Sequence, residues 1–167
     1  GNDIYVYAGT SDVAAGETIT EASSGGTDRI QVDGTTDFST MNAASNFDEI
    51  EELDITGAFT ATFAGVQLTG ESLSLIGDTG GVQALVVNAT ASGTTDLSNI
   101  AAGTDWTAGT DTVTIIGADG SDENIVGTQT DDVITGGTGN DTIDGGSGND
   151  TITGGAGNDA LTGGAGD

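Results

Sequence analysis

A nine-residue repeat occupies residues 127–162 and constrains the fold more than any other feature of the sequence. Its copies read GTQTDDVIT, GGTGNDTID, GGSGNDTIT and GGAGNDALT, and a partial copy, GGAGD, follows them. Each copy has a glycine-rich half and a short half in which an apolar residue lies between less apolar ones. A regular repeat of this kind indicates that each copy is one structural unit stacked on its neighbours.

Each copy predicts a six-residue turn followed by a three-residue strand. In Thr142-Ile143-Asp144 the central side chain would point inward and the flanking ones outward, because side chains alternate along a strand. The glycines suit a turn that needs positive φ and close backbone approach. Two copies would complete one coil, so equivalent turns would lie about 4.8 Å apart along the stack.

This coil predicts paired carboxylates. Asp132 and Asp150 would share one side of the stack, and Asp141 and Asp159 the other. Two carboxylates about 5 Å apart repel by roughly 3 kcal/mol at an effective dielectric constant near 20. A Ca²⁺ ion between them would turn this repulsion into attraction, and turn carbonyls would complete its all-oxygen shell. Mg²⁺ fits less well, because it requires octahedral geometry and retains its water ligands.

The pattern G-G-x-G-x-D-x-apolar-x resembles the calcium-binding nonapeptide of the repeats-in-toxin (RTX) family, whose repeats form a parallel β-roll. The resemblance implies that the sixth-position Asp of two stacked turns binds each ion. It also implies carbonyl ligands from the first and third positions of one turn and the second and fourth of its neighbour. Carried onto this sequence, these are Gly136, Gly137, Thr138, Gly139, Gly145, Gly146, Ser147, Gly148, Gly154, Gly155, Ala156 and Gly157.

Three copies depart from the pattern. Thr128 and Thr130 replace glycines in the first complete copy, so we expect that turn to be distorted or to bind calcium weakly. One copy earlier, ADGSDENIV places Glu123 at the ligand position but lacks the glycines, so we do not expect calcium there. The opening GNDIYV is the second half of a copy and places Asp3 at the same position. Asp3 and Glu123 are therefore only secondary candidates for metal ligands.

The asparagines at the fifth position of the turns have two interpretations. Asn140, Asn149 and Asn158 precede the aspartates, and their side chains could supply oxygen ligands. We favour the other interpretation, that they are turn residues in the left-handed conformation, which asparagine tolerates.

Apolar residues spaced by nine extend the phase of the array toward the N-terminus, from Leu161 through Ile152, Ile143, Ile134 and Ile125 to Ile116. This phase favours an all-β fold: a parallel β-solenoid over residues 1–117, in which 1–7 are the remnant of a preceding RTX repeat, continuing into an RTX β-roll over 118–167. A β-sandwich followed by the β-roll is the alternative, because irregularly spaced strands also fit antiparallel sheets.

Short β-rich runs bounded by turn-forming residues predict the strands of the first region. Leu53 and Ile55 alternate with acidic residues, so that strand would bury one face, whereas 84–87 would be buried on both. A short helix is predicted within 38–47, and Trp106 would fill a corner of the core. The predicted strands span 17–21, 29–32, 50–55, 59–68, 72–76, 82–87, 97–100 and 111–116.

The composition excludes several classes of function. One basic residue, Arg29, faces 27 acidic ones, and the net charge of −26 repels nucleic acid and anionic membranes but attracts a multivalent cation. The chain has no Cys and no His, so it lacks disulfides, thiolate metal sites and the usual general base. Glu51 and Glu52 are adjacent and would face opposite sides of a strand, so we read them as a solvated edge and not as an acid–base pair. We therefore expect no enzymatic activity from this chain.

The charge pattern also predicts where the array folds. In calcium-poor cytoplasm the aspartate repulsion should keep it unfolded, and outside the cell calcium binding would supply folding energy. No apolar run approaches a membrane span and no signal peptide opens the chain, so the sequence is expected to be a piece of a longer polypeptide. The RTX resemblance implies export in the unfolded state by type I secretion.

Three functions remain open at this point. The first is a structural unit of a surface layer, sheath or filament that associates with copies of itself. The second is an adhesin or binding module, and the third is the RTX secretion tail of a larger secreted enzyme. We favour the structural unit, because RTX turns flank the segment and no convergent site is evident. Its acidic, Cys-free composition, rich in Thr, Ala and Gly, is similar to that of surface-layer proteins with RTX blocks.

Overall fold

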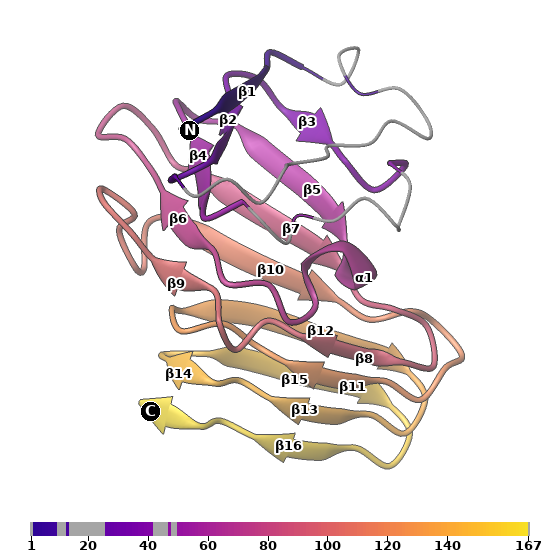
Figure 1. Cartoon of the computed structure of the whole chain (residues 1–167). Coiled ribbons are helices and arrows are strands. Elements are labelled where there is room, and N and C mark those ends of the chain that lie inside the picture. Colours follow the sequence, from indigo (N-terminus) through magenta and orange to yellow (C-terminus); the bar gives the residue numbers. More distant parts are fainter. Residues whose placement is uncertain (1, 10–12, 14–25, 42–46, 48–49, 167) are drawn as a thin grey trace.

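The strands of this chain are stacked in parallel coils. The computed structural model describes residues 2–9, 13, 26–41, 47 and 50–166. Among them, every pairing between named strands is parallel. Successive strands of the chain belong to different sheets, so the backbone winds around a common axis (Figure 1). The prediction of an all-β parallel solenoid that continues into a β-roll is confirmed.

Four sheets, which we name A to D, form the walls of the solenoid. Sheet A contains β1 (Ile4–Tyr7), β2 (Arg29–Val32), β4 (Glu52–Ile55), β6 (Ser74–Ile76) and β9 (Ala101–Ala102). Sheet B contains β3 (Thr36–Asp37), β5 (Thr60–Ala64), β7 (Ala84–Asn88), β10 (Thr112–Ile116), β12 (Asp132–Thr138) and β15 (Thr151–Ala156). Sheet C contains β8 (Thr94–Asp96), β11 (Asn124–Val126), β13 (Thr142–Asp144) and β16 (Ala160–Thr162), and sheet D contains β14 (Ser147–Gly148) and β17 (Ala165–Gly166).

Sheet B joins the irregular coils to the regular ones. Leu85 pairs with Val113, a coil of 28 residues, whereas Val133 pairs with Thr151, a coil of 18 residues. The second value is two nonapeptides, as the repeat predicts. The predicted domain boundary at residues 117 and 118 falls between β10 and β11, and sheet B continues across it from β10 to β12.

The apolar phase of nine ends at Ile125 and does not reach Ile116. Ile115 is the residue that pairs with Ile134 and points into the core, whereas the side chain of Ile116 points outward and is 42% exposed. The coil from β10 to β12 therefore has 19 residues. Its additional residue lies in the turn 117–123, which has seven residues where the repeat has six.

The core becomes thinner from the N-terminal coils toward the roll. The rings of Tyr7, Phe38, Phe47 and Phe63 pack together in the first coils, with Phe38 and Phe63 stacked at a centroid distance of 4.6 Å. In the roll each short strand contributes one inward residue, such as Ile134. One buried isoleucine contributes about 1.5–3 kcal/mol, so the roll has little apolar stabilisation of its own.

Several local predictions are wrong. Residues 97–100 form a turn between β8 and β9, although Leu97 and Ile100 are buried as expected. The strand predicted over 59–68 ends at Ala64, where α1 (Gly65–Leu68) begins and packs on β8. Val86 is only half-buried, so β7 buries one face and not both.

Other predictions are confirmed or lie outside the described residues. Trp106 is buried in the core cluster, as predicted. The predicted strand 17–21 lies outside the described residues, as does most of the helix predicted within 38–47, and Ser39–Thr40 form a turn. In the described part of the chain, no helix has the length and hydrophobicity needed to cross a bilayer.

Candidate calcium-binding site

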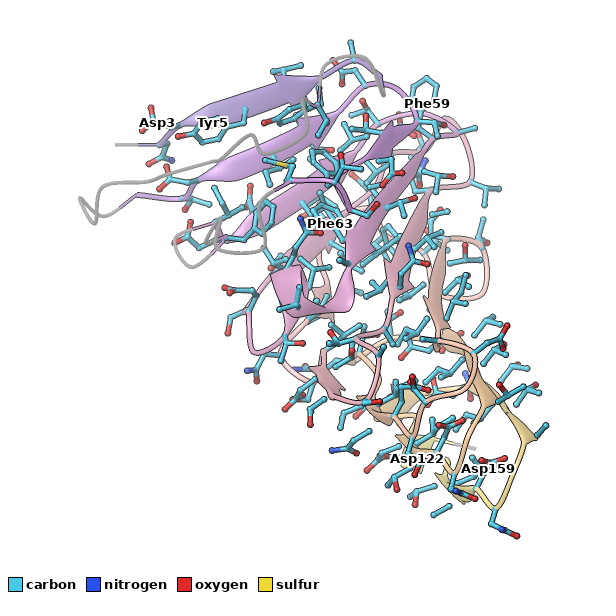
Figure 2. The ribbon with its side chains drawn as sticks, turned by 90° about the vertical axis from the view of Figure 1, so that its right-hand side faces the viewer. Asp3, Tyr5, Phe59, Phe63, Asp122 and Asp159 are labelled. Carbon is cyan, nitrogen blue, oxygen red and sulfur yellow. The ribbon has the colours of Figure 1, made fainter. Side chains whose placement is uncertain are left out.

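The glycine-rich turns form two rows, one on each side of the roll. The first row contains turns 127–132, 145–150 and 163–166, and the second contains turns 117–123, 136–141 and 154–159. Hydrogen bonds join turns of adjacent coils: the nitrogen of Ala165 donates to the carbonyl of Gly146 at 2.7 Å, and the nitrogen of Gly139 to the carbonyl of Ala156 at 2.9 Å. Figure 2 shows Asp122 and Asp159 at this end of the molecule, far from Asp3 and Tyr5.

The sixth-position carboxylates form a ladder along each row. The main-chain nitrogen of Asp132 donates to Oδ1 of Asp150, and that of Asp141 donates to Oδ1 of Asp159, both at 3.0 Å. The structure therefore places together the two pairs that the repeat predicts. One oxygen of each acceptor carboxylate holds the adjacent coil in register, which leaves the other oxygen for a different partner.

That second oxygen lacks a donor in two of the turns. Oδ2 of Asp141 and Oδ2 of Asp150 are buried, and neither has a hydrogen-bond partner among the described residues. An isolated carboxylate oxygen in such a place is costly unless a cation or a donor meets it. The two atoms therefore mark where a positive ion fits.

Main-chain carbonyls of the adjacent coil approach the same places. A Cβ atom added to Gly136 would lie 2.5 Å from both Oδ2 of Asp141 and the carbonyl oxygen of Gly154. At Gly145 the neighbouring atoms are Oδ2 of Asp150 and the carbonyl oxygen of Gly163. No three Asp, Glu, His or Cys side chains of the described residues gather at one point, so a bound ion would need these carbonyls. Such an oxygen-only donor set suits Ca²⁺.

The glycines of the turns leave room for this stacking. Gly155 has φ of +107°, and a Cβ atom on Gly157 would collide with the carbonyl oxygen of Gly139. The predicted carbonyl donors all lie in three turns, 136–141, 145–150 and 154–159, which adopt the same path. They are Gly136, Gly137, Thr138 and Gly139 in the first turn, Gly145, Gly146, Ser147 and Gly148 in the second, and Gly154, Gly155, Ala156 and Gly157 in the third.

Comparison with protein families gives the same assignment. The family model described as the RTX calcium-binding nonapeptide repeat (four copies) matches residues 116–152 and 136–167. Residues 116–167 are a block of RTX calcium-binding repeats. Searches of curated proteins and of solved structures found no match to the chain. RTX repeats are typical of secreted calcium-binding proteins, and the family recognition is thus confirmed for the C-terminal segment.

One turn of the RTX block differs from the others. The nitrogen of Thr128 donates to Oδ2 of Asp132 at 2.7 Å, and its hydroxyl lies 3.0 Å from Oδ1 of the same carboxylate. Thr128 and Thr130 do not adopt positive φ, unlike the glycines at these positions in the other turns. The carboxylate of Asp132 therefore has donors within its own turn. Burial raises the pKa of Asp132 to about 7 and also raises the pKa of Asp150.

The asparagines of the RTX turns do not adopt the left-handed conformation that we predicted. Among the described residues with a side chain, only Ser92 and Asp105 have positive φ. Instead, the side-chain oxygen of Asn140 accepts a hydrogen bond from the nitrogen of Asn158 at 2.9 Å. Asp131 accepts in the same way from the nitrogen of Asn149 at 2.8 Å. The fifth position thus forms a second ladder beside that of the carboxylates.

Carboxylate ladders also occur outside the RTX block, where the sequence gave us no site. The nitrogen of Asp3 donates to Oδ1 of Asp28, and the nitrogen of Asp28 donates to Oε2 of Glu51, both at 2.7 Å. The nitrogen of Gln83 donates to Oδ1 of Asp111 at 2.9 Å. Each acceptor residue directly precedes a strand, and this position is the signal that could have found them.

The N-terminal acidic residues have structural partners. Asp3 begins the ladder on sheet A through its main-chain nitrogen, and its carboxylate remains only a secondary metal candidate. Glu52 was predicted to lie on a solvated edge, but it forms an ion pair with Arg29, which also pairs with Asp54 at 2.8 Å.

Proposed function

We propose that this chain is a calcium-stabilised structural segment of an extracellular assembly, such as a surface layer, sheath or filament. The observation that supports this proposal is the continuity of sheet B. Its six strands run from β3 in the irregular coils to β15 in the RTX block, in one parallel ladder. Stabilising the RTX end therefore stabilises the edge on which the rest of the solenoid is stacked.

Calcium would act as the condition for folding. The RTX block carries buried carboxylate oxygens without donors and only one inward apolar residue in each short strand. Without cations these features oppose folding, and millimolar extracellular calcium would supply the missing energy. The proposal includes export in an unfolded state by type I secretion, which suits a chain that has no cysteine.

Several features support a structural role over a catalytic one. The sequence has no His and no Cys, and among the described residues no three metal-binding side chains converge. The one basic residue, Arg29, is paired with Glu52 and Asp54. These features also disfavour nucleic acid and anionic membranes as partners and leave calcium and other copies of the chain as the proposed partners.

Electron microscopy in the presence and absence of calcium tests the proposal. We expect ordered polymers in millimolar calcium and none after chelation. The Asp141→Asn/Asp150→Asn double variant is the control, because it keeps the hydrogen-bond acceptors but removes two charges from the candidate sites. It should fail to polymerise at the same calcium concentration.

Two other outcomes would replace this proposal. A calcium-bound chain that stays monomeric at all concentrations in analytical ultracentrifugation contradicts self-assembly. If such a monomer binds glycans or a host protein, the adhesin function is the better one. A catalytic domain encoded next to this segment would instead support the role of a secretion tail.

A further inference from the structure

The turn 117–123 contains a buried carboxylate that the RTX consensus does not account for. Glu123 is only 3% exposed, and its Oε2 atom has no hydrogen-bond partner among the described residues. Its other oxygen is 3.4 Å from the nitrogen of Ser92. The sequence did not favour calcium at this turn, because the glycine pattern is absent and the turn has an additional residue.

The stacking of this turn nevertheless repeats that of the consensus turns. The nitrogen of Glu123 donates to Oδ1 of Asp141 at 3.0 Å, as the nitrogen of Asp141 does to Asp159 one coil later. At the fifth position the nitrogen of Asn140 donates to Oδ1 of Asp122 at 2.7 Å. Glu123 is therefore the first member of the carboxylate ladder in this row.

The carbonyls of the two turns also repeat the consensus arrangement. The carbonyl oxygen of Gly136 lies against Gly117, as that of Gly154 lies against Gly136. The carbonyl oxygen of Ser121 lies against Gly139, as that of Gly139 lies against Gly157. The additional residue lies at the third position, where the nitrogen of Gly120 donates to the carbonyl of Thr138. The insertion thus leaves the first, fourth, fifth and sixth positions in register.

We propose that Glu123 and Asp141 hold a Ca²⁺ ion between turns 117–123 and 136–141, at the first coil of the RTX block. Two carboxylates balance the charge of one divalent ion, and the carbonyls of Gly136 and Ser121 are the nearest additional oxygens. This inference rests on the calcium binding proposed for the consensus turns and adds a site that the consensus omits.

The contrast with the other row strengthens this assignment. Asp132 occupies the corresponding position at the start of its row, but Thr128 supplies two donors to its carboxylate. Glu123 has no such donors on Oε2. A carboxylate whose donors come from its own turn needs no cation, whereas a buried one without donors does.

Counting bound calcium by isothermal titration calorimetry tests the site. We expect the Glu123→Gln variant of the full chain to bind one ion fewer than the native chain. The matched control is Asp122→Asn, which removes the same charge from the neighbouring exposed residue. Asparagine can still accept the hydrogen bond at that position, as Asn140 does from Asn158, so this control should bind the native number of ions.

Each result has one interpretation. If Glu123→Gln binds as many ions as the native chain, the proposed site is wrong, although calcium binding by the RTX block stands. If the native chain binds no calcium, the proposed function fails together with the site. Should Glu123→Gln not fold, calcium anomalous scattering from crystals of the native chain decides, because an ion must appear between Glu123 and Asp141.

Discussion

The main-chain nitrogen of Asp141 donates to Oδ1 of Asp159, one coil away, at 3.0 Å. The carboxylate of Asp141 in turn accepts from the nitrogen of Glu123. Each such carboxylate links two coils with one oxygen and presents its second oxygen to the interior of the turn. Coil register and cation binding therefore depend on the same side chain.

Removal of calcium should unfold the RTX block. Chelation exposes the buried carboxylates to mutual repulsion, and the single inward residue of each strand cannot compensate. The β-sheet signal in circular dichroism should decrease strongly in excess chelator and return with calcium, but not with magnesium. An unchanged spectrum in chelator would contradict the role of calcium in folding.

The Asp150→Asn variant should bind calcium at least about tenfold more weakly, a loss of about 1.4 kcal/mol. Asparagine retains the oxygen that accepts from the nitrogen of Asp132 but loses the charge next to Gly145. Asp131→Asn is the matched control in the same row, since Asp131 only accepts from Asn149. Calorimetric titrations of both variants should differ; equal affinities would show that the Asp150 charge is not used.

Replacing Thr128 with glycine should create an additional calcium site. The substitution removes the hydroxyl that bonds the carboxylate of Asp132 and permits the positive φ that the other turns have at this position. We expect Thr128→Gly to bind one ion more than the native chain, whereas Thr128→Ser, which keeps the hydroxyl, should not. The count of bound ions by calorimetry measures this difference, and an unchanged count in Thr128→Gly would refute it.

Without calcium, stability should fall as the pH rises from about 4 to about 7. Burial raises the pKa of Asp132 to about 7, so across this range the folded state holds a proton that the unfolded state has released. Losing that proton leaves a buried charge and destabilises the fold. Thermal unfolding of calcium-free protein across this range measures the slope, and Asp132→Asn should make it shallower. An equal slope in the variant would rule out Asp132 as a contributor.

The aromatic cluster should carry most of the calcium-independent stability. Phe63→Ala removes a buried ring that contacts Phe38 and Phe47 and should cost about 3–5 kcal/mol. Phe59 lies just before the same strand and is only partly buried (Figure 2), so Phe59→Ala should cost clearly less. Denaturant unfolding in saturating calcium compares the two variants. Equal losses would mean that the ring cluster has no special role.

The repeat made the roll predictable, because turn length and strand phase are both encoded in nine residues. The same counting failed at Ile116, where one additional residue in the turn 117–123 changes the residue that points inward to Ile115. The coils of the first region differ in length, so no period indicates their register. The strand predicted over 97–100 failed because a buried apolar pair also suits a tight turn.

The candidate site was predictable only in part. Spacing alone pairs Asp141 with Asp159, but the donors of a carboxylate depend on the path of its own turn. The hydrogen bonds from Thr128 to Asp132 and the absence of a donor at Oε2 of Glu123 are of this kind. They reverse the ranking of the two irregular turns that glycine content suggests.

Every coil of sheet B presents unlike edges to the coil before it and the coil after it, because all its strands run in the same direction. A contact that extends this ladder from one molecule to the next must join one kind of edge to the other. Such a contact is heterologous, and unless its rotation closes a ring it repeats without limit. A polymer built in this way would have a direction, with one growing end chemically distinct from the other.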